Sequence, residues 1–130
     1  MSDLMILAHG GAWETRFQVS SLAASAAAAG EEVEIALFFG ALDSWAGGRW
    51  DALDPAPPVS AERLETLGLP PLSTLLAPGR QTGSIRIYAC SASSRILGLD
   101  MARVQEAVDA VLGWQTMSRM TATAGRVVTF

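Results

Sequence analysis

The sequence predicts an α/β protein with three layers, in which helices cover both faces of a five-stranded parallel sheet. Short continuous apolar runs, typical of strands buried on both faces, alternate with segments that carry helix start and stop residues. Residues 4–39 contain a strand, a helix and a second strand, a βαβ unit that requires parallel pairing and a right-handed crossover. A chain of 130 residues fits one domain, residues 1–130, with its own hydrophobic core.

The expected elements follow from the apolar runs and from the residues that begin and end helices. The expected strands are residues 4–8, 33–39, 85–89, 108–112 and 126–130. The expected helices are residues 15–29, 60–67, 70–77, a short helix directly after Cys90, 101–107 and 115–124. Ser60 and Asp100 are suitable N-caps, and Pro78 is expected to end the helix that precedes it. Glycine stop residues follow at Gly30, Gly68 and Gly98. For residues 108–112, a helix continuous with the preceding one stays an open alternative.

Residues 43–58 hold two tryptophans, a pair of glycines and three prolines, a composition suited to an ordered loop. Tryptophans are large and mostly buried, so Trp45 and Trp50 are expected to fold onto the edge of the core. The alternative is that these two tryptophans contact a ligand or a partner. The helices at 60–67 and 70–77 then complete the crossover to the central strand.

Composition argues against several classes of function. The net charge is −4 and the nine basic residues, all arginine, are scattered, so no basic stripe is present and no nucleic-acid partner is expected. No apolar stretch is long enough to span a bilayer and no signal-peptide pattern is present, so we expect a cytoplasmic location and no membrane partner. One cysteine and one histidine, far apart in sequence, permit no internal disulfide and predict no metal site.

Cys90 lies where the central apolar strand runs into a segment of small polar residues, so a strand-to-helix turn is expected there. Ligands of open α/β sheets bind at the carboxyl ends of strands, where the N–H groups and dipole of a helix favour a thiolate. Ser91 and Ser93 leave the sulfur accessible and can cap the helix or bind an anion, and Arg95 is a candidate cation on the same side. Free cysteines are also often inert core residues, and this reading stays open.

Three motifs follow one another along the chain. The first is an apolar strand, a glycine-containing turn, an alanine-rich helix and a second strand, within residues 4–40. The second is Cys-Ser-Ala-Ser-Ser-Arg at 90–95, with Gly98 shortly after. The third is Val-Asp-Ala-Val-Leu-Gly-Trp at 108–114 together with Arg-Val-Val-Thr-Phe at 126–130. Their order and spacing resemble the DsrE/DsrF-like family of bacterial sulfur-relay proteins, which includes the TusD and YchN types. The resemblance covers most of the chain outside residues 43–83.

The resemblance implies a flavodoxin-like α/β/α fold and trimers or hexamers of this chain or hetero-oligomers with related subunits. We expect no cofactor, and a flavodoxin-like nucleotide or flavin binder stays an open alternative. It implies a sulfurtransferase or sulfur-carrier subunit that takes sulfane sulfur from a donor protein as a persulfide and passes it to an acceptor protein. Only Cys90 matches the sulfur-bearing position. The chain has no resolving cysteine, which favours a carrier over a self-contained oxidoreductase. The alternative is a non-catalytic oligomeric binding or scaffold protein of the same fold, with an inert Cys90.

His9, Gly10 and Trp114 are candidate binding residues because they follow expected strands at the same edge as Cys90. His9 is placed to hydrogen-bond or protonate the sulfur, or else is a turn residue bonded to the backbone. Gly10 is expected to permit a tight turn, and His-Gly-Gly-Ala-Trp fits no phosphate-binding pattern. Trp114 either walls the same cleft or packs on a neighbouring helix or subunit.

Overall fold

The computed structural model describes residues 2–55 and 58–130, and these form a five-stranded parallel sheet with helices on both faces. The strands are β1 (Leu4–Ala8), β2 (Val33–Leu37), β3 (Ile85–Cys90), β4 (Ala110–Leu112) and β5 (Arg126–Thr129). Their order across the sheet is β4-β3-β2-β1-β5, and every pair is parallel. The predicted α/β class, the five strands and their parallel pairing are confirmed.

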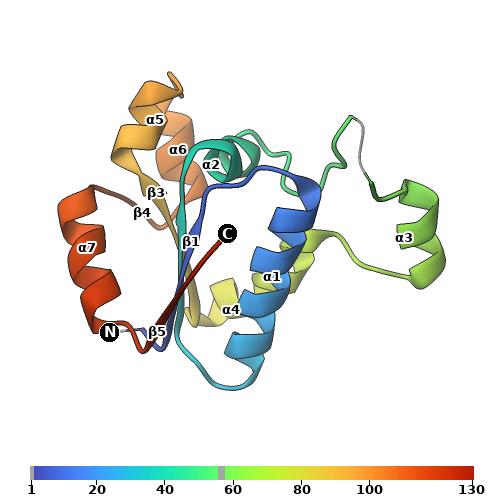
Figure 1. Ribbon diagram of the computed structural model, residues 1–130, viewed down its shortest axis with the longest axis horizontal. Coiled ribbons are helices and arrows are strands. Elements are labelled where there is room, and N and C mark those ends of the chain that lie inside the picture. Colours follow the sequence, from blue (N-terminus) through green and yellow to red (C-terminus); the bar gives the residue numbers. More distant parts are fainter. Residues whose placement is uncertain (1, 56–57) are drawn as a thin grey trace.

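The helices are unequally divided between the two faces (Figure 1). They are α1 (Trp13–Ala28), α2 (Phe39–Ala46), α3 (Ala61–Leu67), α4 (Leu72–Thr82), α5 (Ser91–Ile96), α6 (Met101–Ala107) and α7 (Trp114–Thr123). Helices α1 and α4 lie side by side on one face, α7 lies on the other, and α3 projects away from the sheet. Helices α2, α5 and α6 gather near the carboxyl end of β3.

Successive side chains of each strand point to opposite faces of the sheet, so the strands contribute to two apolar clusters, one on each face. The larger cluster takes Leu4, Ile6 and Ala8 of β1 and the matching residues of β2 and β3, and packs them against α1, α2, α4 and α6. The smaller cluster takes Met5, Ala36, Phe38 and Cys90, and α7 covers it through Met117. The sheet is therefore buried on both faces near its carboxyl edge, as continuous apolar runs predict.

Helix α2 was not expected, because residues 33–39 were predicted as one strand and residues 43–58 as a loop. The strand ends at Leu37, Phe38 donates its N–H to the carbonyl of Ala8 at 2.8 Å, and Phe39 turns the chain with a φ of 39°. Helix α2 then buries Ala41 and Leu42 completely. Burial of this apolar face stabilises the helix, whose start no capping side chain marks in the sequence.

Pro78 does not end α4, so the prediction of a helix over 70–77 was wrong at its C-terminus. The helix continues to Thr82 and stops at Gly83, whose φ is 82°. Gly79, directly after the proline, packs so closely on Ile85 of β3 that a Cβ would collide with the Ile85 side chain. Packing against the sheet thus keeps the last turn helical although Pro78 donates no hydrogen bond.

Trp45 and Trp50 fold onto the core, as predicted. Trp50 is 4% exposed and its indole N–H donates to Ser20 Oγ at 2.9 Å. Trp45 donates to the carbonyl of Ala107 at 2.7 Å, and the two indoles pack edge to face. Their polar atoms are satisfied inside the protein, so these tryptophans fasten residues 43–54 to α1 and α6.

Candidate functional site at the carboxyl edge of the sheet

Cys90 is the last residue of β3 and the N-cap of α5, so the predicted strand-to-helix turn is present. Its Sγ atom accepts a hydrogen bond from the backbone N–H of Ser93 at 3.4 Å. The hydroxyl of Ser94 donates to the Cys90 carbonyl at 2.9 Å and reinforces the turn. The sulfur thus occupies the place where helices commonly hold an oxygen acceptor, next to N–H groups that have no partner within the helix.

The thiol is covered by apolar side chains. Cys90 is 1% exposed and belongs to the cluster of Met5, Ala36, Phe38 and Met117. Trp114, the first residue of α7, stacks on Phe38 with 5.0 Å between ring centroids and 26° between ring planes. Phe38 therefore belongs both to the cluster that contains the sulfur and to the stack with the indole, and with α7 it forms part of the cover of Cys90.

An open apolar cleft lies beside this cover. Its volume is about 490 Å³, and its lining residues are Leu7, His9, Phe38, Phe39, Trp114 and Thr129. The cleft is at the carboxyl ends of β1, β2 and β5, the edge at which open α/β sheets bind their ligands. Phe39 and Trp114 are 44% and 54% exposed, unusually high values for such large rings.

His9 and Cys90 share this edge but are not brought together. The register pairs Ala8 with Leu37 and Leu37 with Ala89, so the next row runs His9, Phe38, Cys90. Neighbouring strands are ~4.8 Å apart, which puts the backbones of His9 and Cys90 ~10 Å from each other with Phe38 between them. Within residues 2–55 and 58–130 the exposed His9 ring has no hydrogen-bond partner, although its backbone N–H donates to the Phe130 carbonyl at 2.9 Å.

The other predicted binding residues at this edge are Ser91, Ser93, Arg95 and Gly10. Ser93 is buried and contributes its backbone N–H to the sulfur, and Ser91 is partly buried at the start of α5. Arg95 is exposed in the last turn of α5 and forms no ion pair with any residue that the structure describes. Gly10 has a negative φ and lies against Thr15, so it does not supply the left-handed conformation that a glycine turn would use.

Sequence reasoning did not identify Phe38 and Phe39 as site residues, since both were assigned to the interior of a strand. Phe39 is the one non-glycine residue with a positive φ in the part of the chain that the structure describes. A Phe-Phe-Gly sequence after an apolar strand was the available signal, because a strand that ends there points two aromatic rings at the carboxyl edge.

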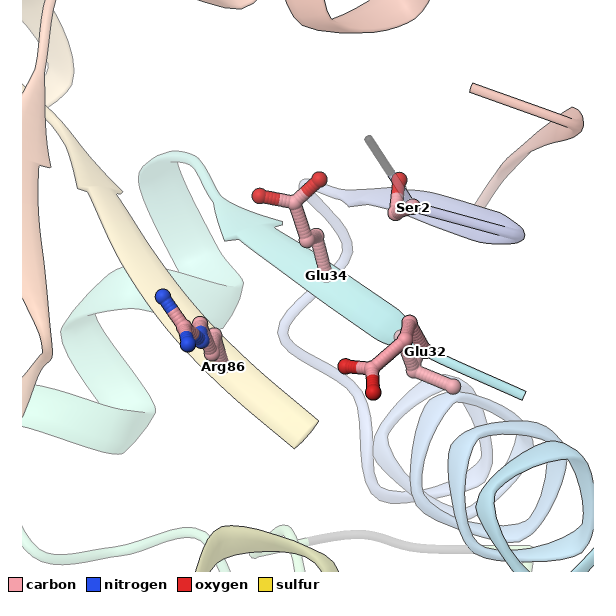
Figure 2. A pocket seen from close by; sticks show the side chains of 5 residues that line it. Ser2, Glu32, Glu34 and Arg86 are labelled. Atoms are coloured by element: carbon pink, nitrogen blue, oxygen red, sulfur yellow. The ribbon is translucent and has the colours of Figure 1, made fainter. Parts of the chain in front are cut away.

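The sheet face that α7 covers is apolar near the carboxyl edge and polar near the amino ends of β2 and β3 (Figure 2). Glu34 of β2 and Arg86 of β3 are register partners there, and with Ser2 and Glu32 they line a hollow of about 200 Å³. Tyr88 follows on the same face of β3. Burial raises the pKa of Tyr88 to about 12, and the nearby Glu34 carboxylate adds to the rise because it favours the neutral phenol.

The described residues can also be searched for a metal site and for a membrane-spanning helix. Within residues 2–55 and 58–130, no cluster of three or more histidine, cysteine, aspartate or glutamate side chains is arranged to hold a metal ion. In the same ranges, no helix combines the length and the apolar character needed to cross a lipid bilayer.

Comparison with known proteins supports the architecture. No family model and no curated protein matches this sequence. A solved structure of a protein of unknown function, MTH1491 from Methanobacterium thermoautotrophicum, is similar with a TM-score of 0.61. The alignment covers 98% of this chain and 97% of that chain at 15% identity. The likeness therefore extends over the whole fold, and it shows the fold alone.

Proposed function

We propose that this protein is a sulfur-relay subunit that carries sulfane sulfur as a persulfide on Cys90 and passes it to a partner protein. The observation that carries the proposal is the position of the thiol, at the carboxyl end of a central strand and within hydrogen-bonding distance of the Ser93 N–H. The sequence resemblance to DsrE/DsrF-like proteins at 90–95 points to the same residue. The thiolate, once formed, has a backbone donor already directed at it.

The transfer is an exchange at sulfur and requires no external oxidant. The Cys90 thiolate attacks the outer sulfur of a donor persulfide, R–S–SH. The S–S bond of the donor breaks, a new S–S bond forms on Cys90, and the donor leaves as the thiolate R–S⁻. Transfer to an acceptor thiolate repeats the exchange with Cys90 as the leaving group. Both steps conserve atoms and electrons.

Cys90 is 1% exposed, so the proposal includes an opening step. We place this step at Phe38 and Trp114, which stack on each other at the edge of the apolar cluster that encloses the sulfur. The opening would be a local displacement of the first turn of α7. Met117 is the one fully buried residue of this helix, so few buried contacts oppose the displacement.

Cyanide as a small acceptor tests the carrier role. After incubation with a persulfide donor and removal of excess reagent, the native protein should release one thiocyanate per chain when cyanide is added. Cys90→Ala should release none, whereas Ser93→Ala should behave as the native protein because the donor to Sγ is a backbone N–H. Release from Cys90→Ala at the native level would refute the assignment.

A second candidate is an oligomeric binding or scaffold protein in which Cys90 is inert. The burial of Cys90 among Met5, Phe38 and Met117 is the observation that favours it. Under this alternative, the thiol reacts with an alkylating reagent only in the unfolded protein. Alkylation in native buffer, at a rate that does not depend on the rate of global unfolding, would exclude it.

The proposed partners are sulfur donor and acceptor proteins in the cytoplasm, with the chain assembled as a trimer or hexamer or with related subunits. The polar part of the sheet face, near the amino ends of β2 and β3, supports assembly. Glu34 and Arg86, of opposite charge, lie beside each other there. Light scattering at micromolar concentration tests this part of the proposal, and a monomer would contradict it.

A further inference from the structure

We propose that the cleft between β1, β2 and the start of α7 binds a small, uncharged planar aromatic ligand, with Trp114 as its stacking surface. The inference concerns the cleft and does not depend on the reactivity of Cys90. Its volume of about 490 Å³ is large enough for a ligand of two fused rings. The cleft opens at the carboxyl edge of the sheet, where ligands of this fold class bind.

The indole of Trp114 has one occupied face and one open face. Phe38 stacks on it at 5.0 Å and 26°, which accounts for one side of the ring. The residue is nevertheless 54% exposed. Trp13 and Trp50 are in contrast 7% and 4% exposed, and the Trp45 ring packs against Trp50 and the Arg80 guanidinium, which lies 5.3 Å from its centroid. Trp114 is therefore the tryptophan whose π surface is available to a ligand.

Phe39 is held on the cleft in a conformation that costs energy. Its φ of 39° is unfavourable for a bulky side chain. The neighbouring backbone fixes this conformation, because Gly40 packs against Gly11 so closely that a Cβ on Gly11 would lie 2.9 Å from the Gly40 carbonyl carbon. Ala41 also donates its N–H to the His9 carbonyl at 3.3 Å. Strain that the surrounding structure maintains is typical of ligand clamps, and here it places an aromatic ring 44% exposed on the cleft.

The lining also limits the charge of the ligand. Leu7 and the three aromatic rings are apolar, and no lysine, arginine, aspartate or glutamate lines the cleft. His9 and Thr129 are exposed at its edge and can each form a hydrogen bond with a polar substituent. A charged ligand would find no counter-ion there, whereas a neutral aromatic ring with one polar group matches every lining residue.

Binding of naphthol, compared with its saturated counterpart decahydronaphthol, tests the inference by NMR. Naphthol should shift the indole N–H signal of Trp114, assigned by its absence in Trp114→Phe, together with amides of residues 7–9, 38–40 and 114–117. Decahydronaphthol has similar size and polarity without π surfaces and should bind more weakly by roughly three- to tenfold. Equal affinity for the two compounds, or shifts elsewhere on the protein, would overturn the proposal.

Variants separate binding from folding. Trp114→Leu should lose roughly three- to tenfold in naphthol affinity, while Trp114→Phe keeps most of it. Phe39→Gly should also weaken binding without lowering the melting temperature, because glycine adopts a positive φ without strain. Val127→Ala, at an exposed apolar residue outside the cleft, should bind as the native protein does. Cleft signals that shift with protein concentration in the absence of probe would identify a second copy as the occupant and overturn the proposal.

Discussion

The Sγ atom of Cys90 accepts the backbone N–H of Ser93 at 3.4 Å, so the only cysteine of the chain caps a helix. This contact fixes the sulfur at the carboxyl edge of β3 while the ring of Phe38 encloses it from the neighbouring strand. The structure thus combines a sulfur atom that accepts a backbone hydrogen bond with a closed apolar cover, and experiments can test whether that cover opens.

Phe38→Ala should accelerate alkylation of Cys90 in the folded protein, because it removes the ring that separates the sulfur from the cleft. The substitution also destabilises the fold, by ~3–5 kcal/mol for a buried aromatic ring. Leu76→Ala is the matched control, since Leu76 is 1% exposed in the cluster on the other face of the sheet. Equal acceleration in both variants would mean that Cys90 reacts through global unfolding and that Phe38 is no specific cover.

Arg16→Met should lower the free energy of unfolding by ~1–3 kcal/mol, the typical cost of leaving a buried hydrogen-bond acceptor without its donor, here the carbonyl of Trp50. Arg16 is 2% exposed, donates to the carbonyls of Gly11 and Trp50 at 3.0 and 2.6 Å, and pairs with Asp54 at 2.8 Å. Arg49→Met removes an exposed pair with Asp43 and should cost ~0–1 kcal/mol. Urea unfolding measures both, and similar losses would contradict a structural role specific to Arg16.

Tyr88 should titrate with a pKa of about 12 in the folded protein, against 10.0 for the ordinary phenol. Below pH 10.0 the phenol is protonated in both folded and unfolded chains, so Tyr88 adds no pH dependence. Between pH 10.0 and about 12 the unfolded chain releases the proton that the folded chain retains, so stability falls as pH rises. Tyr88 is the only tyrosine, and phenolate absorbance after a rapid pH jump reports it alone.

Glu34→Gln provides the control for that titration. Removing the carboxylate should lower the pKa of Tyr88 without returning it to 10.0, because burial, the larger cause, remains. The same measurement on the urea-unfolded chain should give the ordinary value. A folded-state pKa that Glu34→Gln leaves unchanged would show that the carboxylate does not act on the phenol.

Gly11→Ala should destabilise the protein by ~1–3 kcal/mol, the range typical of overpacking. The added Cβ would lie 2.9 Å from the backbone of Gly40, and both segments are tied to strands. Gly10→Ala places its Cβ 3.0 Å from the side chain of Thr15, which can move, so its cost should be smaller. Thermal unfolding compares them, and an equal or larger loss in Gly10→Ala would contradict this reading of the β1 turn.

The five strands and most helix ends could be predicted because local signals decide them. Continuous apolar runs marked strands that are buried on both faces, and Gly30, Gly68 and Gly98 do adopt the positive φ that ends a helix. Ser60 and Asp100 accept backbone N–H groups at 3.1 and 3.0 Å as N-caps. Helix α2 and the end of α4 were missed because burial of Leu42 and packing of Gly79 on Ile85 outweigh local sequence.

The candidate site was predictable only in part. Its edge and Cys90 follow from the order of strands and helices along the chain. The separation of His9 from Cys90 depends on the spatial order of the strands, which puts β2 and Phe38 between them. The strained turn at Phe39 depends on the approach of Gly11, in the connection between β1 and α1, to Gly40 in the first turn of α2, a contact that no local pattern reveals.

The central claim is that Cys90 carries sulfur, and the most direct test is the intact mass of the folded protein after incubation with a persulfide donor and removal of excess reagent. The account predicts a gain of one sulfur atom per chain that a reductant reverses, and no gain in Cys90→Ser. A native protein that gains no sulfur, while the same chain gains it once unfolded, would contradict the account and identify Cys90 as an inert core residue.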